Sequence, residues 1–336
     1  MLDPASSASW LRVTPKGLYC EPGDFYVDPR WPVSRAVVTH GHGDHARPGH
    51  DHVLATPETL AIMRHRFADD AGQHQPLPYG EATALGDVGV KFVPAGHILG
   101  SAQVVLDYRG ERAVVSGDYK RRADPTCAPF EPQSCDVFIT EATFGLPVFR
   151  HPPDTNEIDK LLHSLTIFPD RAHLVGVYAL GKCQRIISLL RRQGYEQPIY
   201  MHGALFGLCA LYERFGVALG PLLPITDVAK DALRGKIVLA QPGAANEPWS
   251  RRLPDPLVAQ ASGWMRVRQR AKASGVELPL VISDHADWDE LTQTIAEVKP
   301  GELWVTHGAE EALIHQAGKM GVRARALSLS GYEDEE

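Results

Sequence analysis

The chain has 336 residues, of which 44% are hydrophobic and 22% are charged. This is the composition of a globular protein that can bury a core, and it excludes disordered, collagen-like and coiled-coil chains. The length indicates two domains, or one large domain with an insertion. No apolar run approaches the ~20 residues of a membrane-spanning helix, and the opening MLDPASSASW lacks the pattern of a secretory signal. We therefore expect a cytoplasmic protein without a membrane partner.

The net charge of −7 argues against attraction of nucleic acid over the whole surface, although a local basic groove is compatible with it. The five cysteines form no Cys-x-x-Cys pair, so the sequence indicates neither a disulfide framework nor a zinc ribbon. The unusual count is that of the 15 histidines, because several fall in one short cluster.

Turn residues and hydrophobic spacing predict the elements in chain order. Thr56 and Pro57 predict a helix that runs to about Phe67, with Thr56 as its N-cap. Strands that alternate with helices in the middle of the chain indicate a small parallel α/β unit. Strands are expected at 36–39, 90–93, 104–106, 113–116, 173–178, 198–202, 236–240, 278–283 and 303–306. Further helices are expected at 181–192, 206–215, 288–298 and after Gly308.

Six apolar runs in this chain end in a histidine, an aspartate or a glutamate. Catalytic groups often follow strand ends, where a rigid sheet aims them at one point. One such ending is commonplace, but six endings in residue types that bind metals indicate a shared site. The residues at these endings are His40, His97, Asp118, Glu141, the pair Asp284-His285, and His307.

The densest ending reads Thr39-His40-Gly41-His42-Gly43-Asp44-His45. Imidazoles at i and i+2 can bind one metal from an extended turn, and Asp44 and His45 then point toward a second metal. Imidazole with carboxylate suits zinc, and also manganese or iron. The alternative is a polar loop with incidental histidines, and the specific His-x-His-x-Asp-His pattern disfavours it. His50 and His52, just downstream, are predicted to be surface residues.

This histidine pattern resembles the signature of the metallo-β-lactamase superfamily. The stretches 96–101 and 116–118 resemble later motifs of that fold. Glu141, 283–287 and 306–308 resemble the three motifs of its β-CASP nuclease branch. The opening segments 17–20 and 25–29 resemble the bacterial ligase-associated DNA exonucleases. The resemblance covers nearly the whole chain.

The resemblance implies an α/β fold of a particular kind. It is a four-layer αββα metallo-β-lactamase sandwich built from residues 1–145 and 281–336. A β-CASP α/β cap domain would be inserted at residues 146–280.

The resemblance also implies a site for two divalent metal ions, with zinc expected and manganese as an alternative. Phosphodiester cleavage needs a proton for the departing oxygen, and His285 is the candidate general acid, oriented and charged by Glu141. Asp28 either braces the histidine-rich loop or is a turn residue before Pro29. The implied ligands are His40, His42 and His97 for one metal and Asp44, His45 and His307 for the other, with Asp118 bridging and Asp44 essential for catalysis.

Three cations are candidates for binding substrate phosphates. Lys182 and Arg185 open a predicted helix, where backbone N–H groups attract phosphate. The alternative there is a glycine turn with solvated charges. Arg121 lies close after Asp118 and could contact phosphates near the metals.

The predicted activity is hydrolysis of nucleic acid phosphodiesters by a DNA exonuclease of repair. Single-stranded DNA would be the substrate, and a DNA ligase is an implied partner. The alternative is an RNA-processing nuclease of the same fold, like those of mRNA 3′-end processing. His307 supports that alternative, since histidine at the third β-CASP motif is typical of RNA-acting members, whereas Artemis-like DNA nucleases usually have valine. The opening segment nevertheless favours DNA.

Two other classes fit the residues less well. A small-molecule hydrolase, such as a lactonase or thioesterase, shares the first motifs but needs neither the long insertion nor His285 in its present context. A non-catalytic scaffold would have lost ligands, whereas this chain retains every ligand that the resemblance implies.

Overall fold

The computed structural model describes residues 8–226 and 228–327, which form two compact units. The terminal unit is built from the chain up to Arg150 and from His285 onward, and the central unit is built from His151–Asp284. None of the helices in these described ranges is both long and apolar enough to cross a membrane.

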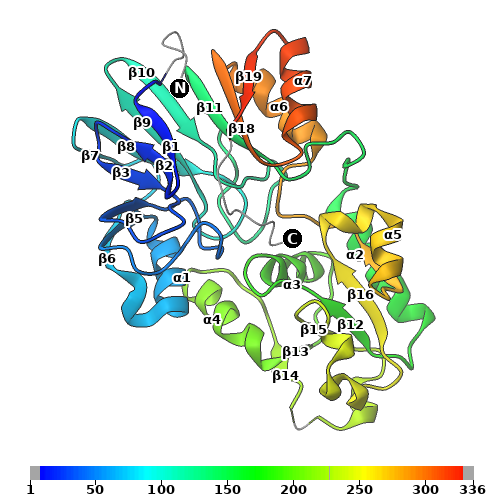
Figure 1. Ribbon diagram of the computed structural model, residues 1–336. Coiled ribbons are helices and arrows are strands. Elements are labelled where there is room, and N and C mark those ends of the chain that lie inside the picture. The colour runs from blue at the N-terminus through cyan, green and yellow to red at the C-terminus, as the bar shows by residue number, and fades with distance from the viewer. Residues whose placement is uncertain (1–7, 227, 328–336) are drawn as a thin grey trace. The chain divides into compact units, whose positions relative to one another are not determined.

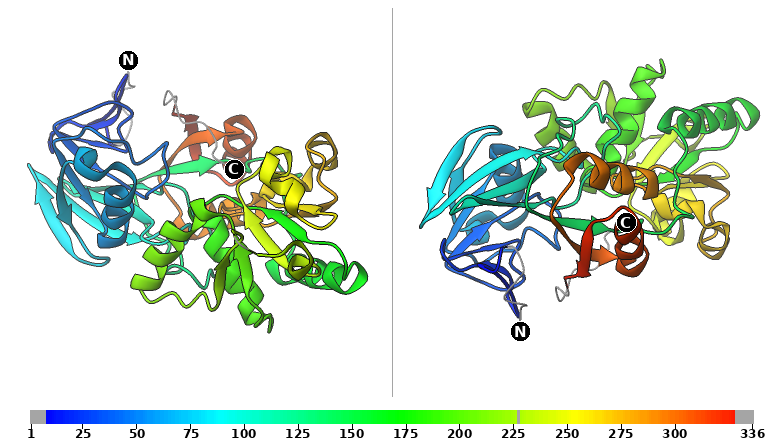
Figure 2. Two further views of the ribbon diagram at one scale, coloured as in Figure 1. Left: turned by 90° about the horizontal axis from the view of Figure 1, so that it is seen from below. Right: turned by 90° about the horizontal axis from the view of Figure 1, so that it is seen from above.

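Two β-sheets form the terminal unit (Figure 1). The first sheet has the strand order β1 (Leu11–Thr14), β2 (Gly17–Cys20), β3 (Phe25–Val27), β4 (Arg35–Val37), β5 (His52–Ala55) and β6 (Gln73–Pro76). The second has the order β19 (Arg323–Ala326), β18 (Glu302–Gly308), β11 (Val137–Ala142), β10 (Glu111–Val115), β9 (Ala102–Tyr108), β8 (Val88–Pro94) and β7 (Ala82–Leu85). Strand β18 pairs in parallel with β11, so the C-terminal segment, orange and red in Figure 2, lies beside a strand from before the central unit.

Three clusters of buried side chains hold the terminal unit together. In the first, Phe25 of the first sheet and Phe92 of the second belong to one core. In the second, Phe138 and other side chains of the second sheet pack with helices α6 (Trp288–Val298) and α7 (Glu310–Lys319). In the third, the first sheet packs with helix α1 (Pro57–Phe67) through Leu60 and Met63. Each sheet therefore contributes side chains to two cores.

The helix starts follow their capping residues. The hydroxyl of Thr56 accepts a hydrogen bond from the N–H of Thr59, and Pro57 is the first helical residue, so the predicted start of α1 is confirmed. The carboxylate of Asp287 caps α6 in the same way, and Glu290 returns a bond to the N–H of Asp287. This capping box ends the segment that carries His285.

The central unit is built on a parallel sheet, as predicted for the middle of the chain. Its order is β14 (Leu222–Pro224), β13 (Ile199–Met201), β15 (Ile237–Ala240), β12 (His173–Gly176), β16 (Leu257–Ala261) and β17 (Leu278–Leu280). Its helices are α2 (Asp154–Ile167), α3 (Lys182–Arg192), α4 (Phe206–Arg214) and α5 (Arg268–Ala273). Short 3-10 helices lie at Ala68–Ala71 in the terminal unit and at Gly203–Leu205, Lys230–Leu233, Ala244–Asn246, Pro248–Arg252 and Gly263–Arg266 in the central unit.

Candidate metal centre

The histidine-rich loop begins two residues after strand β4 and is fixed by Asp28, which follows β3. One oxygen of Asp28 accepts the N–H of Thr39 at 2.8 Å. The other accepts the Thr39 hydroxyl at 2.6 Å and lies 2.7 Å from Nδ1 of His45. Asp28 is 4% exposed, so these bonds are shielded from water. Of the two alternatives for Asp28, the structure has the one in which its side chain braces the loop.

These bonds also determine which ring nitrogen of two histidines can bind a metal. Because the Thr39 hydroxyl donates to Asp28, it accepts a bond from Nδ1 of His40, 3.0 Å away. His45 likewise donates from Nδ1 to Asp28. Both rings therefore direct Nε2 away from Asp28. Such a bond to the far nitrogen fixes the tautomer and orientation of a metal-binding imidazole.

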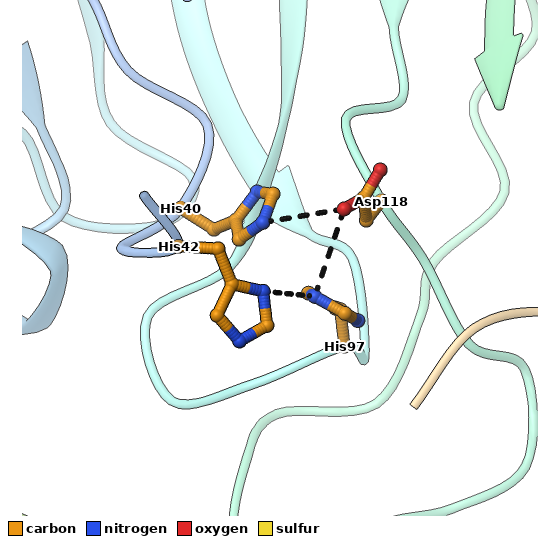
Figure 3. Close-up of side chains that lie close together, drawn as sticks. All are labelled: His40, His42, His97 and Asp118. Carbon is orange, nitrogen blue, oxygen red and sulfur yellow. Dashed lines mark hydrogen bonds and ion pairs between the residues drawn. The ribbon is translucent and has the colours of Figure 1, made fainter. Parts of the chain in front are cut away.

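Asp118 lies where several of these rings converge (Figure 3). Its Oδ2 is 3.4 Å from Nε2 of His40, 3.3 Å from Nε2 of His45 and 3.8 Å from Nε2 of His97. Nδ1 of His42 is 2.9 Å from Nε2 of His97. Ligand atoms of His40, His42, His97 and Asp118 all lie within 4.8 Å of one another, and the same holds for His40, Asp44 and His45. This set of imidazoles and carboxylates fits divalent zinc or manganese.

Two glycines allow the loops of this cluster to approach one another. Gly96, directly before His97, has a φ of 75°, and a Cβ there would lie 2.3 Å from the carbonyl oxygen of Lys120. Gly117, directly before Asp118, has a φ of 55°, and a Cβ there would lie 2.8 Å from Cβ of Thr39. Both positions need the left-handed conformation and the close contact that glycine permits.

Burial and charge divide the cluster into neutral and charged groups. Burial lowers the pKa of His40 and of His97 well below the usual range, so both rings are neutral. Burial alone would also lower the pKa of His45, but the carboxylates of Asp118 and Asp44 raise it well above its usual value. Burial alone would raise the pKa of Asp118, but the neighbouring histidines, with His45 foremost, together lower it well below its usual value, so this carboxyl is ionised.

His307 reaches the cluster from strand β18, far along the chain. The register between β11 and β18 shifts at this point, since Glu141 opposes Thr306 whereas Ala142 opposes Gly308. His307 is thus the extra residue of a bulge, with a φ of 58° that is rare for a non-glycine residue. Its ring centroid is 5.3 Å from that of His45, and burial lowers the pKa of His307 to about 3.

Glu141 and His285 form a second pair beside Asp118. Oε2 of Glu141 lies 2.9 Å from Nδ1 of His285, and Oε1 accepts the N–H of Tyr119 at 2.7 Å. Glu141 is 1% exposed, and burial raises its pKa against the opposing effect of His285. The centroid of the His285 ring is 4.7 Å from that of His97. The sequence-predicted acid and its orienting carboxylate are therefore in contact, next to the metal-binding rings.

The three predicted phosphate-binding cations are all occupied by carboxylates. Lys182 is fully buried with Nζ 3.3 Å from Oδ2 of Asp284, and Arg185 is fully buried and bonded to Asp154 at 2.6 Å. Arg121 pairs with Glu297 at 2.6 Å. That these three side chains contact substrate phosphates stays a prediction.

Three residues near the site have roles that the sequence did not indicate. His50 is 3% exposed and accepts the N–H of Val33, so its predicted surface position is wrong. Thr39 links Asp28 to His40, and only its place before the first histidine could have signalled this. Lys120 is fully buried and donates to the carbonyl of His285 at 3.1 Å. No pattern in the sequence distinguishes Lys120 from a surface lysine.

Comparison with known proteins finds relatives that are named as a ligase and as nucleases. No protein-family model matches the chain. It is 31% identical over 317 residues to a probable DNA ligase of Opitutus terrae, a match that covers 93% of this chain and 30% of that protein. It is 29% identical over 222 residues to Ribonuclease TTHA0252 of Thermus thermophilus, covering 56% of this chain and 51% of the ribonuclease. The chain thus spans about a third to half of the length of these relatives.

A solved structure shares the fold. It is a protein of unknown function from Enterococcus faecalis, with a TM-score of 0.60 at 14% identity over 89% of this chain and 80% of that one. These relatives agree with the motifs of the chain, which resemble those of the β-CASP branch of the metallo-β-lactamase superfamily.

Proposed function

We propose that this chain is a two-metal-dependent phosphodiesterase that cleaves nucleic acid. The observation that carries the proposal is the convergence of imidazole nitrogens from separate loops on Oδ2 of Asp118, at 3.3 to 3.8 Å. Seven residues of ligand type are assigned to the centre. His40, His42 and His97 would hold one cation, Asp44, His45 and His307 would hold the other, and Asp118 would be shared between them.

The proposed architecture is a four-layer αββα sandwich with an inserted cap domain. The four layers are supported by three core clusters. One lies between the two sheets, one between the first sheet and α1, and one between the second sheet and helices α6 and α7. The parallel sheet of the central unit supports a separate cap. The proposed division at residues 145/146 and 280/281 lies close to the edges of the two compact units, at 150/151 and 284/285.

The chemistry follows from the donor groups. When bound, two divalent cations neutralise charge on the phosphoryl oxygens and lower the pKa of a shared water. His285 donates the proton that the departing oxygen needs. Glu141 accepts a hydrogen bond from Nδ1–H of His285. This bond orients the ring and favours its charged form. Asp28 and Thr39 keep Nε2 of His40 and His45 turned toward the cations.

We propose single-stranded DNA as the substrate and DNA repair, in concert with a DNA ligase, as the setting. The match of nearly the whole chain to part of a probable DNA ligase supports this choice. RNA is the second candidate, because another relative is named a ribonuclease and because His307 occupies the third motif.

A comparison of end-labelled DNA and RNA single strands of one sequence tests the proposal. The protein is incubated with each strand in zinc, in manganese, and in excess chelator, and product lengths are followed with time. We expect metal-dependent cleavage that removes nucleotides progressively from one end of the DNA. Faster cleavage of RNA would reverse the choice of substrate. Absence of cleavage of both strands in either metal would contradict the proposed activity.

A further inference from the structure

Buried polar side chains bind the backbone of residues 281–284 within the central unit and that of His285 within the terminal unit. Within the central unit, Oε2 of Glu157 accepts the N–H of Val281 at 2.8 Å. Nζ of Lys182 donates to the carbonyl of Ile282 at 3.0 Å and lies 3.3 Å from Oδ2 of Asp284. Side chains of the central unit therefore hold the backbone in place up to the residue before His285.

The charged side chains that make these contacts are buried. Lys182 and Arg185 are both fully buried, and Asp284 is 3% exposed. Arg185 bonds Asp154 at 2.6 Å and lies 4.0 Å from Oδ1 of Asp284. Removing charges from water costs free energy, and a well-packed apolar cluster would not incur this cost. Stability alone therefore does not explain the arrangement. It is better explained as a way to define one geometry.

The terminal unit binds the same segment from His285 onward. Lys120, also fully buried, donates from Nζ to the carbonyl of His285 at 3.1 Å and lies 3.6 Å from Oε2 of Glu290. The N–H of Ala286 donates to the carbonyl of Tyr119 at 2.6 Å. The boundary between the two units falls at the Asp284–His285 peptide bond. A buried lysine of each unit thus fixes the backbone next to this bond.

We propose that Lys182 and Lys120 are positioning residues for the proton transfer from His285. The inference deepens the proposed function, on which it rests, by assigning the alignment of the acid to two buried lysines that bind the backbone on either side of the Asp284–His285 peptide bond. In that step the Nε2–H proton of His285 passes to the departing oxygen as its bond to phosphorus breaks. A misplacement of about 1 Å in such a group can lower a rate by about 100-fold. Lys182 acts through the backbone and touches no substrate.

Lys182→Met tests this inference, because methionine retains the length and apolar stem of the lysine while it removes the ammonium group. The variant is assayed on an oligonucleotide and on a p-nitrophenyl ester of a nucleotide, whose p-nitrophenolate departs without a proton. We expect kcat on the oligonucleotide to fall by about 30- to 100-fold with KM unchanged. On the ester we expect a change of less than about threefold. Bound metal should be unchanged.

Three further variants complete the test. Lys120→Met should show the same split between the two substrates. Lys182→Arg, which restores the cation, should recover part of the oligonucleotide rate. Arg171→Met is the matched control, since Arg171 pairs with Glu277 and Asp255 within the central unit, and it should leave both rates unchanged. If Lys182→Met does not fold, Asp284→Asn removes the same ion pair and should show the same split.

The outcomes separate this inference from the proposed function. Equal losses of rate on both substrates would mean that Lys182 serves only the fold. Unchanged rates would mean that the contacts of Lys182 do not affect catalysis. Either result overturns the inference while it leaves the nuclease activity in place. An inactive wild-type protein would instead overturn the proposed function and the inference with it.

Discussion

Oδ2 of Asp28 lies 2.7 Å from Nδ1 of His45, and the same oxygen accepts the hydroxyl of Thr39. Through these two bonds one buried carboxylate determines the tautomer of His45 directly and that of His40 through Thr39. Asp28 itself has a φ of 44°, a strained conformation for an aspartate, which persists because its side chain is held on three sides. We therefore expect the affinity for metal to depend on Asp28, which is not among the proposed ligands.

Replacement of Asp28 by asparagine should weaken metal binding without loss of the fold. The amide has only one oxygen that can accept a hydrogen bond, so the His45 ring loses its partner. The affinity for zinc should then fall by about 10- to 100-fold. Calorimetric titration of the metal-free protein with zinc measures the change. Asp24→Asn is the control, because Asp24 is exposed and pairs with Tyr19 outside the cluster. Equal affinities for the wild type and Asp28→Asn would contradict the role given to Asp28.

Asp44→Ala should abolish cleavage of nucleic acid while the protein remains folded. Asp44 is partly exposed, and its Oδ2 lies 3.4 Å from Nε2 of His45, so its loss removes a ligand rather than part of a core. Cleavage rates and the circular dichroism spectrum report the two properties separately. Turnover at the wild-type rate would show that the assigned second metal position is incorrect.

His285→Ala should lower kcat on an oligonucleotide by about 100- to 10,000-fold, the range for loss of a general acid, with metal content retained. Glu141→Gln should have a smaller effect, since Glu141 acts on the ring of His285 and not on the substrate. Steady-state kinetics with metal analysis of each variant distinguish these effects. Loss of bound metal in His285→Ala would instead identify His285 as a ligand.

The buried His50 should make the metal-free protein less stable at acidic pH. Burial lowers the pKa of His50 to about 4, whereas the unfolded chain has the ordinary value near 6.5. Between these values the unfolded state binds more protons, so stability is full above about pH 6.5 and falls as the pH drops toward 4. The contribution is on the order of 3 kcal/mol at most.

Urea unfolding at pH 7 and at pH 4.5 measures this effect. His50→Gln keeps an acceptor for the N–H of Val33 but cannot take up the proton, so its loss of stability between the two pH values should be smaller than that of the wild type. His52→Gln, at an exposed position, should behave as the wild type does. An unchanged pH dependence in His50→Gln would argue that this imidazole is not buried in the neutral form.

The parts of the site that the sequence could predict are those with short-range patterns. Four ligand-type residues lie within 40–45, and the cap of α1 is encoded by Thr56 and Pro57. Strands β1, β2 and β3 were not predicted, whereas β4 and β15, which are as short, were predicted from their apolar runs. Their pairing is set by neighbours in the sheet and not by their own residues.

The surroundings of charged side chains were the least predictable. Lys182 and Arg185 lie at the start of a helix, as predicted. Both are buried, however, and each pairs with a carboxylate from a distant segment of the chain. Lys120 is held by contacts more than 160 residues away along the chain. Such burial depends on tertiary contacts, and no local pattern of residues encodes it.

Anomalous diffraction from crystals grown with zinc or manganese tests the central claim most directly. The account predicts two metal peaks next to Asp118, one bound by His40, His42 and His97 and the other by Asp44, His45 and His307. A single peak, or metals bound away from these residues, would contradict it.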